Sequence, residues 1–400
     1  MDITNGDIPH VGPGTPGGDW LRRYWLAVGA ARELYDIPQA VRVLGEDLVL
    51  FRDLKGRPGL LGRACAHRGA SLEYGDIEAR GIRCVYHGWL YGVSGRCLEQ
   101  PSESGAGTFC HKVSQVSYPV HEQGGLIFAY LGPDPENPPP FLKFSPLVDH
   151  GGQRLVEDIR HFDYNWFNFY ENSADPCHVW ILHGASGYGR QSWGDRFFSA
   201  DDPPAFEPVD TPYGMKIVMT KPSGAPGTFF VDEMSLGLPS ILQVGDTPYV
   251  HAQVDPQLGL NAGSDYEHLL FLTPNDDDHF MLFTVDYYTG PEPDIFGRLA
   301  EMRRREEPDE QLKPHDKRPL MPFRGNVRRE DIVAQGTQDI LGRRAEHLGP
   351  SDRGVIMLRK MVREAIQAVA DGKDPKALHL DANSDGLVTL DSFVGVRPVP

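Results

Sequence analysis

The sequence predicts an α+β protein of two domains, a small antiparallel β domain over residues 1–140 and a larger α+β domain over residues 141–400. The length of 400 residues exceeds the usual size of one domain. Short strand-like runs separated by glycine turns fill the first part, whereas strand-like and charged helical runs mix in the second. Between them, Pro133–Phe141 contains three consecutive prolines, which can neither donate to a β ladder nor continue a helix.

Three segments of the first domain carry clear local signals. After a Gly/Pro-rich arm, Asp19–Val28 predicts a short helix. Val41–Asp53 alternates apolar and polar residues around a Gly-Glu-Asp turn, which predicts a β-hairpin. The run GGLIFAYLG, residues 124–132, predicts a further strand. These signals indicate a small antiparallel β domain with loops at one tip.

The second domain mixes both kinds of element. The runs HLLFLTP and HFMLFTVDYY, residues 268–274 and 279–288, are rich in the residues that strands prefer. Charged helical patterns cover residues 295–307 and 330–371. We therefore expect an α+β domain.

Two short cysteine–histidine pairs indicate the chemistry of the chain. Cys65-x-His67 and Cys84-x-x-His87 are separated by the sixteen residues 68–83. Two thiolates and two imidazoles are the ligand set of a Rieske [2Fe–2S] cluster, in which histidines replace two cysteines on one iron. The sequence therefore predicts such a cluster at these four residues.

A structural zinc site is the alternative, because two cysteines and two histidines also bind zinc. Zinc sites usually pair two cysteines and then two histidines, whereas each half of this motif mixes the two. Gly69 and Gly88 stand where a loop must fold over a cluster. The pattern favours iron–sulfur over zinc.

The segments CAHRGASLEYG and CVYHGWLYGVSG resemble the Rieske domain of the ring-hydroxylating Rieske non-haem iron oxygenases. From about Val11 to Arg359 the chain resembles the phthalate-type branch of that family, whose oxygenase has a single kind of subunit. This resemblance implies that the Rieske domain is followed by a helix-grip-like catalytic domain with a mononuclear Fe(II).

The arrangement Glu171-x3-Asp175-x2-His178-x4-His183 matches the mononuclear iron motif of that family. Ferrous iron that activates O2 needs two imidazoles and one carboxylate on one face, with open positions beside them. His178 and His183 are the expected imidazole ligands. Five residues on a regular helix rotate by about 140°, so we predict a π-like widening that brings both rings to one metal.

Asp175 has two interpretations. Because Pro176 follows it, Asp175 could cap a helix that has proline at its first position. In the family, the matching aspartate bridges the iron histidine to a cluster histidine of a neighbouring subunit. The complete motif favours the bridge, and both roles can hold together.

The third iron ligand is expected near the C-terminus, because the segment from Arg328 resembles the family's helix that completes the metal triad. Asp331 fits the position of the ligand, with Gln335 and Gln338 on the same helical face. Asp339 is the rival, and its alternative interpretation is a solvated helix charge. We favour Asp331.

The bulk composition limits the partners and the location. The net charge is 39 − 56 = −17 and repels phosphate backbones, which argues against nucleic-acid binding. The N-terminal residues contain no secretion signal, and the apolar runs are too short to span a bilayer. Cys97, Cys110 and Cys177 remain outside the cluster motif, and an odd number fits reduced thiols in the cytoplasm. We expect a cytoplasmic protein without membrane contact.

Two further motifs are similar to known binding sites only in part. Gly12-x-Gly14-x-x-Gly17 has the spacing of a dinucleotide fingerprint, but no convincing strand precedes it and its prolines remove two donors. Asp381–Ser392 begins like a calcium loop but has serine where a bidentate glutamate belongs. We interpret both as turns, with a weak adventitious ion site as the alternative at Asp381–Ser392.

The resemblance implies an oxygenase component that uses O2 and electrons from a separate NAD(P)H-dependent reductase. The expected reaction is hydroxylation or O-demethylation of an aromatic, carboxylated compound. A cis-dihydroxylating dioxygenase is the second interpretation, and a Rieske electron carrier without oxygenase activity is the third. The resemblance also implies a head-to-tail homotrimer.

The sequence says less about the substrate. Trp166, Trp180 and Tyr188 could line a ring site, although core packing explains each of them better. Arg190 and Arg196 are candidates for binding a carboxylate.

Overall fold

The computed structural model describes the chain except for a set of segments, namely residues 1–2, 104–107, 158, 184–203, 245–265, 291–293, 295, 298–326, 342–345, 384–385 and 399–400. The described part has the α+β composition that the sequence predicts, with mostly antiparallel sheets and few helices.

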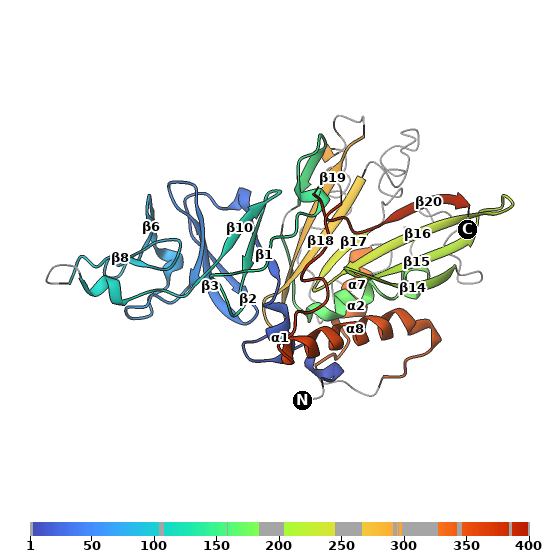
Figure 1. Ribbon diagram of the computed structural model, residues 1–400, viewed down its shortest axis with the longest axis horizontal. Coiled ribbons are helices and arrows are strands. Elements are labelled where there is room, and N and C mark those ends of the chain that lie inside the picture. Colours follow the sequence, from blue (N-terminus) through green and yellow to red (C-terminus); the bar gives the residue numbers. More distant parts are fainter. Residues whose placement is uncertain are drawn as a thin grey trace.

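The N-terminal third forms three small antiparallel sheets, drawn in blue and cyan in Figure 1. Their strands, sheet by sheet, are β1 (Trp25–Ala30), β11 (Leu126–Tyr130) and β10 (Val120–Gln123); β2 (Gln39–Val43), β3 (Glu46–Arg52), β4 (Pro58–Gly62) and β9 (Ser117–Tyr118); and β5 (Asp76–Glu78), β6 (Gly81–Arg83), β7 (Leu90–Tyr91) and β8 (Cys97–Glu99). The third sheet lies at one end of the molecule.

One nine-stranded antiparallel sheet forms the centre of the C-terminal part. Its order is β12 (Gln153–Val156), β19 (Phe280–Tyr288), β18 (Tyr266–Pro274), β17 (Ile241–Val244), β16 (Thr228–Gly237), β15 (Gly214–Pro222) and β14 (Ala205–Thr211), while β13 (Arg160–Phe162) pairs with β19 and β20 (Phe393–Pro398) with β16. The strand-like runs at residues 268–274 and 279–288 are therefore confirmed as β18 and β19, which form a hairpin next to the edge strand β12.

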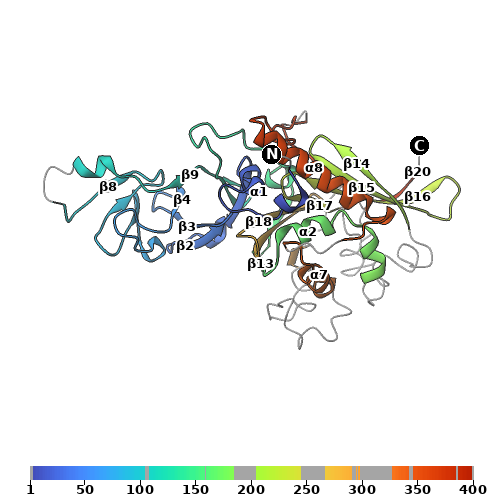
Figure 2. The ribbon, with the colours of Figure 1, turned by 90° about the horizontal axis from the view of Figure 1, so that it is seen from below.

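Helices cover one face of the large sheet. These are α2 (Trp166–Asn172), α7 (Val327–Gly336) and α8 (Arg353–Ala370), with α2 between the other two (Figures 1 and 2). The π-helix η6 (Val179–His183) follows α2, and α1 (Pro16–Leu21) packs on α8. None of the described helices is long and apolar enough to cross a membrane.

Short 3₁₀ helices connect these elements. They are η1 (Asn5–Asp7), η2 (Ala31–Glu33), η3 (Leu72–Tyr74), η4 (Thr108–Lys112), η5 (Ser145–Leu147) and η7 (Pro350–Asp352). Residues 131–144 contain neither helix nor strand, as the proline-rich linker predicts.

Two apolar cores are present among the described residues. The larger core runs from the β1–β11 sheet into the large sheet, where Phe128 lies edge-on to Phe271 with ring centroids 5.3 Å apart. The smaller core fills the tip and includes Cys65 and Cys84. Because the larger core extends to both sides of the linker, the first strands pack firmly on the large sheet. The domain division at residue 140 stays a prediction.

The hairpin predicted at Val41–Asp53 is confirmed as β2–β3, but its turn differs from the predicted Gly-Glu-Asp. Val43 pairs with Glu46, so the turn residues are Leu44 and Gly45, with φ of 49° and 81°. A two-residue hairpin turn with positive φ at both positions matches the twist of the flanking strands.

Two helix predictions need correction. The predicted helix Asp19–Val28 is wrong in its second half, because α1 ends at Leu21 and Trp25–Ala30 forms strand β1. Pairing with β11 there outweighs local helix propensity. The helix predicted over residues 330–371 is interrupted between α7 and α8, and residues 295–307 lie almost entirely outside the described residues.

A buried ion pair joins α2 to α8. Arg359 is 3% exposed and donates two hydrogen bonds to Glu171, from Nε at 2.8 Å and from Nη2 at 2.9 Å. The same guanidinium contacts Glu346 at 2.5 Å. Such a fork-to-carboxylate contact fixes orientation as well as distance. It holds α2 in place just before the segment that contains His178 and His183.

Candidate metal centres

Two loops of the same construction lie at the tip of the N-terminal part. Each begins at a cysteine, whose N–H donates to the carbonyl five residues on and whose carbonyl accepts from the glycine four residues on. These glycines, Gly69 and Gly88, have φ of 77° and 72°, which a residue with a Cβ rarely adopts. The repeated pattern places Cys65 and Cys84 in equivalent positions.

The folded tip groups like residues together. Cys65 and Cys84 are 3% and 2% exposed, and burial together with the neighbouring Cys65 thiol raises the pKa of Cys84. The rings of His67 and His87 lie outside them, half-buried, with centroids 4.5 Å apart. The sequence mixes the two residue types in each half, but the structure pairs cysteine with cysteine and histidine with histidine. This donor set fits a cluster with two thiolates on one iron and two imidazoles on the other.

Three side chains that the sequence did not single out support this tip. Trp89 stacks on His67 with ring centroids 4.3 Å apart. The Tyr91 hydroxyl lies 3.2 Å from Cys65 Sγ. Gln115 accepts from Ala66 N–H at 2.9 Å, and its amide donates to two carbonyls before Cys65. Trp89 and Tyr91 lie within the second motif, whereas nothing in the sequence pointed to Gln115.

A second group of ligand atoms lies beneath the large sheet. One atom each of His178, His183 and Asp331 lies within 4.8 Å of the others. Asp331 Oδ1 is 3.4 Å from His183 Nε2 and 3.9 Å from His178 Nε2. Asp339, the rival, is exposed near the end of the same segment and is not part of this group.

Both imidazoles present Nε2 to the same point because their Nδ1 atoms are held elsewhere. His178 Nδ1 lies 2.5 Å from the Asp175 carbonyl oxygen, and His183 Nδ1 lies 2.8 Å from Glu330 Oε2. Burial lowers the pKa of His178, which favours the neutral ring that a metal ligand requires. Burial alone would also lower the pKa of His183, but hydrogen bonds and charge from Asp331 and Glu330 outweigh burial and raise it. The two imidazoles and one carboxylate fit a ferrous ion.

The helix widening that the histidine spacing predicts is confirmed. Val179–His183 is a π-helix, whose i→i+5 hydrogen bonds bring residues five apart close to one face. His178 directly precedes it and His183 ends it. A regular helix would direct the two rings away from each other.

Asp175 directly precedes the turn that leads into this helix. Its Oδ1 accepts from Cys177 N–H at 2.9 Å, across Pro176, which is the capping role. Its side chain is half-buried, so part of it remains open to another molecule. A bridge to a neighbouring subunit involves a second chain and stays a prediction.

Asn172 is a further residue at this site that the sequence did not single out. Its amide nitrogen lies 3.1 Å from His178 Nε2 and 3.5 Å from Asp331 Oδ1. It therefore contacts two of the three proposed ligand atoms from the end of α2. It lies within the quoted motif, but asparagine is an uncommon ligand and gave no separate signal.

Comparison with known proteins identifies the family. Residues 24–116 match the model of the Rieske [2Fe-2S] domain. The chain is 34% identical to the tert-butanol monooxygenase / tert-amyl alcohol desaturase oxygenase subunit of Aquincola tertiaricarbonis, over 99% of this chain and 84% of that protein. It is also 34% identical to the phenoxybenzoate dioxygenase subunit alpha of Ectopseudomonas oleovorans, over 96% of this chain and 89% of that protein.

The chain belongs to the Rieske oxygenases. A third relative, the 5,5'-dehydrodivanillate O-demethylase oxygenase subunit of a Sphingobium strain, is 31% identical over 94% of this chain and 83% of its own length. A crystal structure of dicamba monooxygenase bound to dicamba has the same fold, with a TM-score of 0.61 at 19% identity over 88% of this chain and 99% of that one. This Rieske oxygenase is thus an oxidoreductase, and it carries a Rieske [2Fe–2S] cluster and a mononuclear iron.

The substrate residues expected from the sequence lie in different places. Trp166 is fully buried against Trp20 and Tyr170, which is core packing, and Trp180 is also buried. Tyr188 and the two candidate carboxylate-binding residues, Arg190 and Arg196, lie outside the described residues.

The two partial motifs behave as turns in this Rieske oxygenase. Residues 12–15 form a turn before α1, and a Cβ on Gly17 would lie 2.7 Å from three backbone carbonyl oxygens. Close packing therefore explains that glycine. In the Asp381–Ser392 segment, Gly386 N–H donates to the Asn383 carbonyl, and β20 follows where a calcium motif requires a helix.

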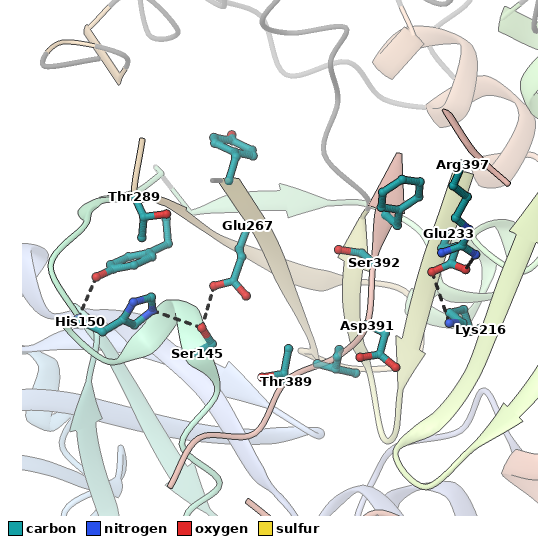
Figure 3. Close-up of a pocket in the computed structure, with 14 residues that line it drawn as sticks. Ser145, His150, Lys216, Glu233, Glu267, Thr289, Thr389, Asp391, Ser392 and Arg397 are labelled. Carbon is teal, nitrogen blue, oxygen red and sulfur yellow. Dashed lines mark hydrogen bonds and ion pairs between the residues drawn. The ribbon is translucent and has the colours of Figure 1, made fainter. Parts of the chain in front are cut away.

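A cavity of about 650 Å³ lies on the opposite face of the large sheet and is not the metal site (Figure 3). On one side of it Ser145 donates to Glu267 at 2.8 Å, and on the other Glu233 contacts both Lys216 and Arg397. None of the seven metal-ligand candidates lines this cavity.

Replacing Tyr91 with phenylalanine should lower the reduction potential of the cluster. The hydroxyl near Cys65 Sγ stabilises the more negative reduced state, and its removal takes that stabilisation away. The measurement is a redox titration followed by the cluster's visible absorption. Tyr86→Phe is the control, because Tyr86 is exposed at the tip. Equal potentials for Y91F and the wild type would contradict this role.

Replacing Glu330 with glutamine should weaken mononuclear iron binding roughly 10- to 100-fold, as loss of a carboxylate behind a ligand histidine does elsewhere. Glu330 is fully buried and orients the His183 ring. Competition with a ferrous chelator measures the affinity, and acid-labile sulfide reports whether the cluster is retained. Asp339→Asn is the matched control and should keep wild-type iron affinity. Iron loss in D339N instead would favour Asp339 as the ligand.

Proposed function

We propose that Cys65, His67, Cys84 and His87 hold the cluster and that the group formed by His178, His183 and Asp331 holds the mononuclear iron. The observation that carries this proposal is the convergence of three ligand atoms with both Nε2 atoms directed inward. The cluster supplies electrons singly, and the iron supplies O2 activation. The chain's own residues orient these centres and position the substrate.

The proposed activity is hydroxylation or O-demethylation of an aromatic, carboxylated compound by a cytoplasmic oxygenase component. O2 is the co-substrate, and the electrons come from a separate NAD(P)H-dependent reductase. Two relatives support this class, one named for phenoxybenzoate and the other for dehydrodivanillate demethylation. The relative named for tert-butanol shows that relatives of similar identity also act outside this class.

A cis-dihydroxylating dioxygenase is the second candidate, favoured by the relatives named as dioxygenases of phenoxybenzoate and phthalate. An electron carrier without oxygenase activity is disfavoured, because it would leave the inward-facing histidines and Asp331 without a role.

We also propose a head-to-tail homotrimer. In Figures 1 and 2 the sheet β5–β8, next to the cluster loops, lies at one end of the molecule, while α2 and α7 lie toward the other. One chain therefore keeps its two centres apart, and a neighbouring copy would supply the cluster that faces each iron. Heterologous contacts of this kind close naturally into a ring. Asp175, half-buried before the π-helix, would bridge them.

Oxygen uptake with a panel of methoxylated and unsubstituted aromatic acids, driven by a surrogate reductase, tests the activity. Demethylation should release one formaldehyde per O2 consumed, whereas dihydroxylation should yield a diol and no formaldehyde. Either outcome should require a chain that holds both the two-iron cluster and the mononuclear iron. Absence of substrate-dependent uptake across the panel would contradict the proposed substrate class.

Replacing Asp175 with asparagine should slow electron transfer between the centres by several orders of magnitude and leave both metals bound. The reason is that the bridge needs a carboxylate, whereas the amide can still accept from Cys177 N–H and keep the turn. Stopped-flow reoxidation of the reduced cluster measures the rate, and metal analysis checks occupancy. Asp134→Asn in the exposed linker is the control. Wild-type turnover in D175N would show that the relay is wrong.

A further inference from the structure

A buried carboxylate that is not one of the proposed metal ligands lies on the helix-facing side of the large sheet. Asp286 on β19 is fully buried, and its Oδ1 accepts from the Tyr266 hydroxyl at 2.6 Å. The same oxygen lies 2.5 Å from His268 Nδ1. His268 and Asp286 are directly paired in register across β18 and β19. Neither the cluster nor the iron site uses this group.

The register shows which face His268 occupies. Pro274 pairs with Phe280, and residues an even number apart on a strand share a face. The Phe280 ring stacks on Phe162 with centroids 4.7 Å apart and lies 5.6 Å from the ring of Phe169 on α2. His268 therefore lies on the face that α2 covers. The cavity of Figure 3 is on the other face, where the next residue, Glu267, points.

The direction of α2 brings the proposed metal ligands toward the end of the β18–β19 hairpin where His268 and Asp286 lie. At the start of the helix, Asn165 donates to the Asp277 carbonyl in the β18–β19 turn. At its end, Tyr170 donates to the Gly237 carbonyl, which the register across β17 places level with Phe271. The helix thus advances along β18 from the turn toward its first residues. The π-helix follows α2, and His268 lies three residues beyond Phe271 in the same direction.

The chemistry of the pair leaves one nitrogen available. Because Nδ1 donates to the Asp286 carboxylate, the tautomer and the orientation of the ring are set, as in other aspartate–histidine pairs. Among the described residues His268 Nε2 has no hydrogen-bond partner, and the side chain is 20% exposed. A ring held by a buried acid, with an Nε2 that makes no hydrogen bond to a described residue, is suited to contact a ligand.

We propose that His268 is a substrate-positioning residue whose Nε2 shares a proton with an acidic oxygen of the substrate, a carboxyl or phenolic group. This inference rests on the proposed function and adds a contact to it. Asp286 fixes the ring, and His268 anchors the substrate so that the opposite part of the aromatic ring faces the group formed by His178, His183 and Asp331.

Two substitutions at this position separate anchoring from structure. In His268→Asn, the shorter amide can still donate to Asp286 in place of Nδ1 but has no atom at the position of Nε2. In His268→Gln, the longer amide can reach the position of Nε2. His279→Gln is the matched control, because His279 forms a similar contact with Asp276 at 2.8 Å, but in the solvent-exposed turn of the same hairpin.

The test is anaerobic titration calorimetry of the metal-loaded full chain with benzoate, phenol and anisole. H268N should raise the dissociation constant of benzoate roughly 10- to 100-fold, the range for a hydrogen bond to a charged group, or that of neutral phenol about 2- to 10-fold, and leave anisole unchanged. H268Q should recover part of the loss, and H279Q should match the wild type. Melting temperature and iron content should be unchanged in all three variants.

The two acidic ligands identify the group that is anchored. If H268N weakens the binding of benzoate alone, the anchored group is a carboxyl. If it weakens the binding of phenol alone, the anchored group is a phenolic hydroxyl. Equal dissociation constants in H268N and the wild type for both acidic ligands overturn the proposal. So does a loss of anisole binding in H268N that is as large as the loss of benzoate or phenol binding. Binding needs no turnover, so the result is independent of the oxygen-uptake panel. If H268N oxidises the panel compounds as well as the wild type and binds both acidic ligands equally well, the proposed function stands and this inference is removed.

Discussion

The contact between Glu330 and His183 is the constraint on which the iron site depends. It uses Nδ1 of the His183 ring, so Nε2 faces His178 and Asp331. Glu330 and Asp331 are adjacent on α7, so one carboxylate orients the imidazole while the next is placed to share its metal. The Arg359–Glu171 pair then holds α2, and with it the π-helix, against α8. The geometry of the proposed iron site thus depends on Glu330 and Glu171, which are not among its proposed ligands.

The cluster tip depends on burial as well as on ion pairs, because Arg83 contacts Glu78 and Glu99 and also donates to the Gly88 carbonyl of the second cluster loop. The cysteines lie within an apolar core, and the histidines lie outside it next to solvent. This separation places the soft ligands where water is excluded and the imidazoles where another protein surface can approach. The same fold therefore has a shielded side and an accessible side at one cluster.

Much of the fold and of the candidate iron site was predictable from local sequence patterns. The α+β class, the β2–β3 hairpin, the β18 and β19 strands and the π-helix all have signals within a few residues. The end of α1 and the interruption between α7 and α8 were not predicted. In those segments pairing with β11 and packing on other elements decide against local propensity. Gln115 and Glu330 gave no signal of their own, because their partners lie far away in sequence.

The sequence by itself determined the two ligand motifs, since cysteine and histidine at fixed short spacings leave few chemical alternatives. Only the tertiary structure showed which carboxylate lies beside His178 and His183, because Asp331 is on α7 whereas Asp339, of the same chemistry, is exposed beyond the end of that helix. It also decided that His268 and Asp286, eighteen residues apart, form one group, since cross-strand pairing depends on register. Spacing along the chain specifies ligands within one loop or helix turn, whereas contacts between elements exist only once the sheet and helices have packed.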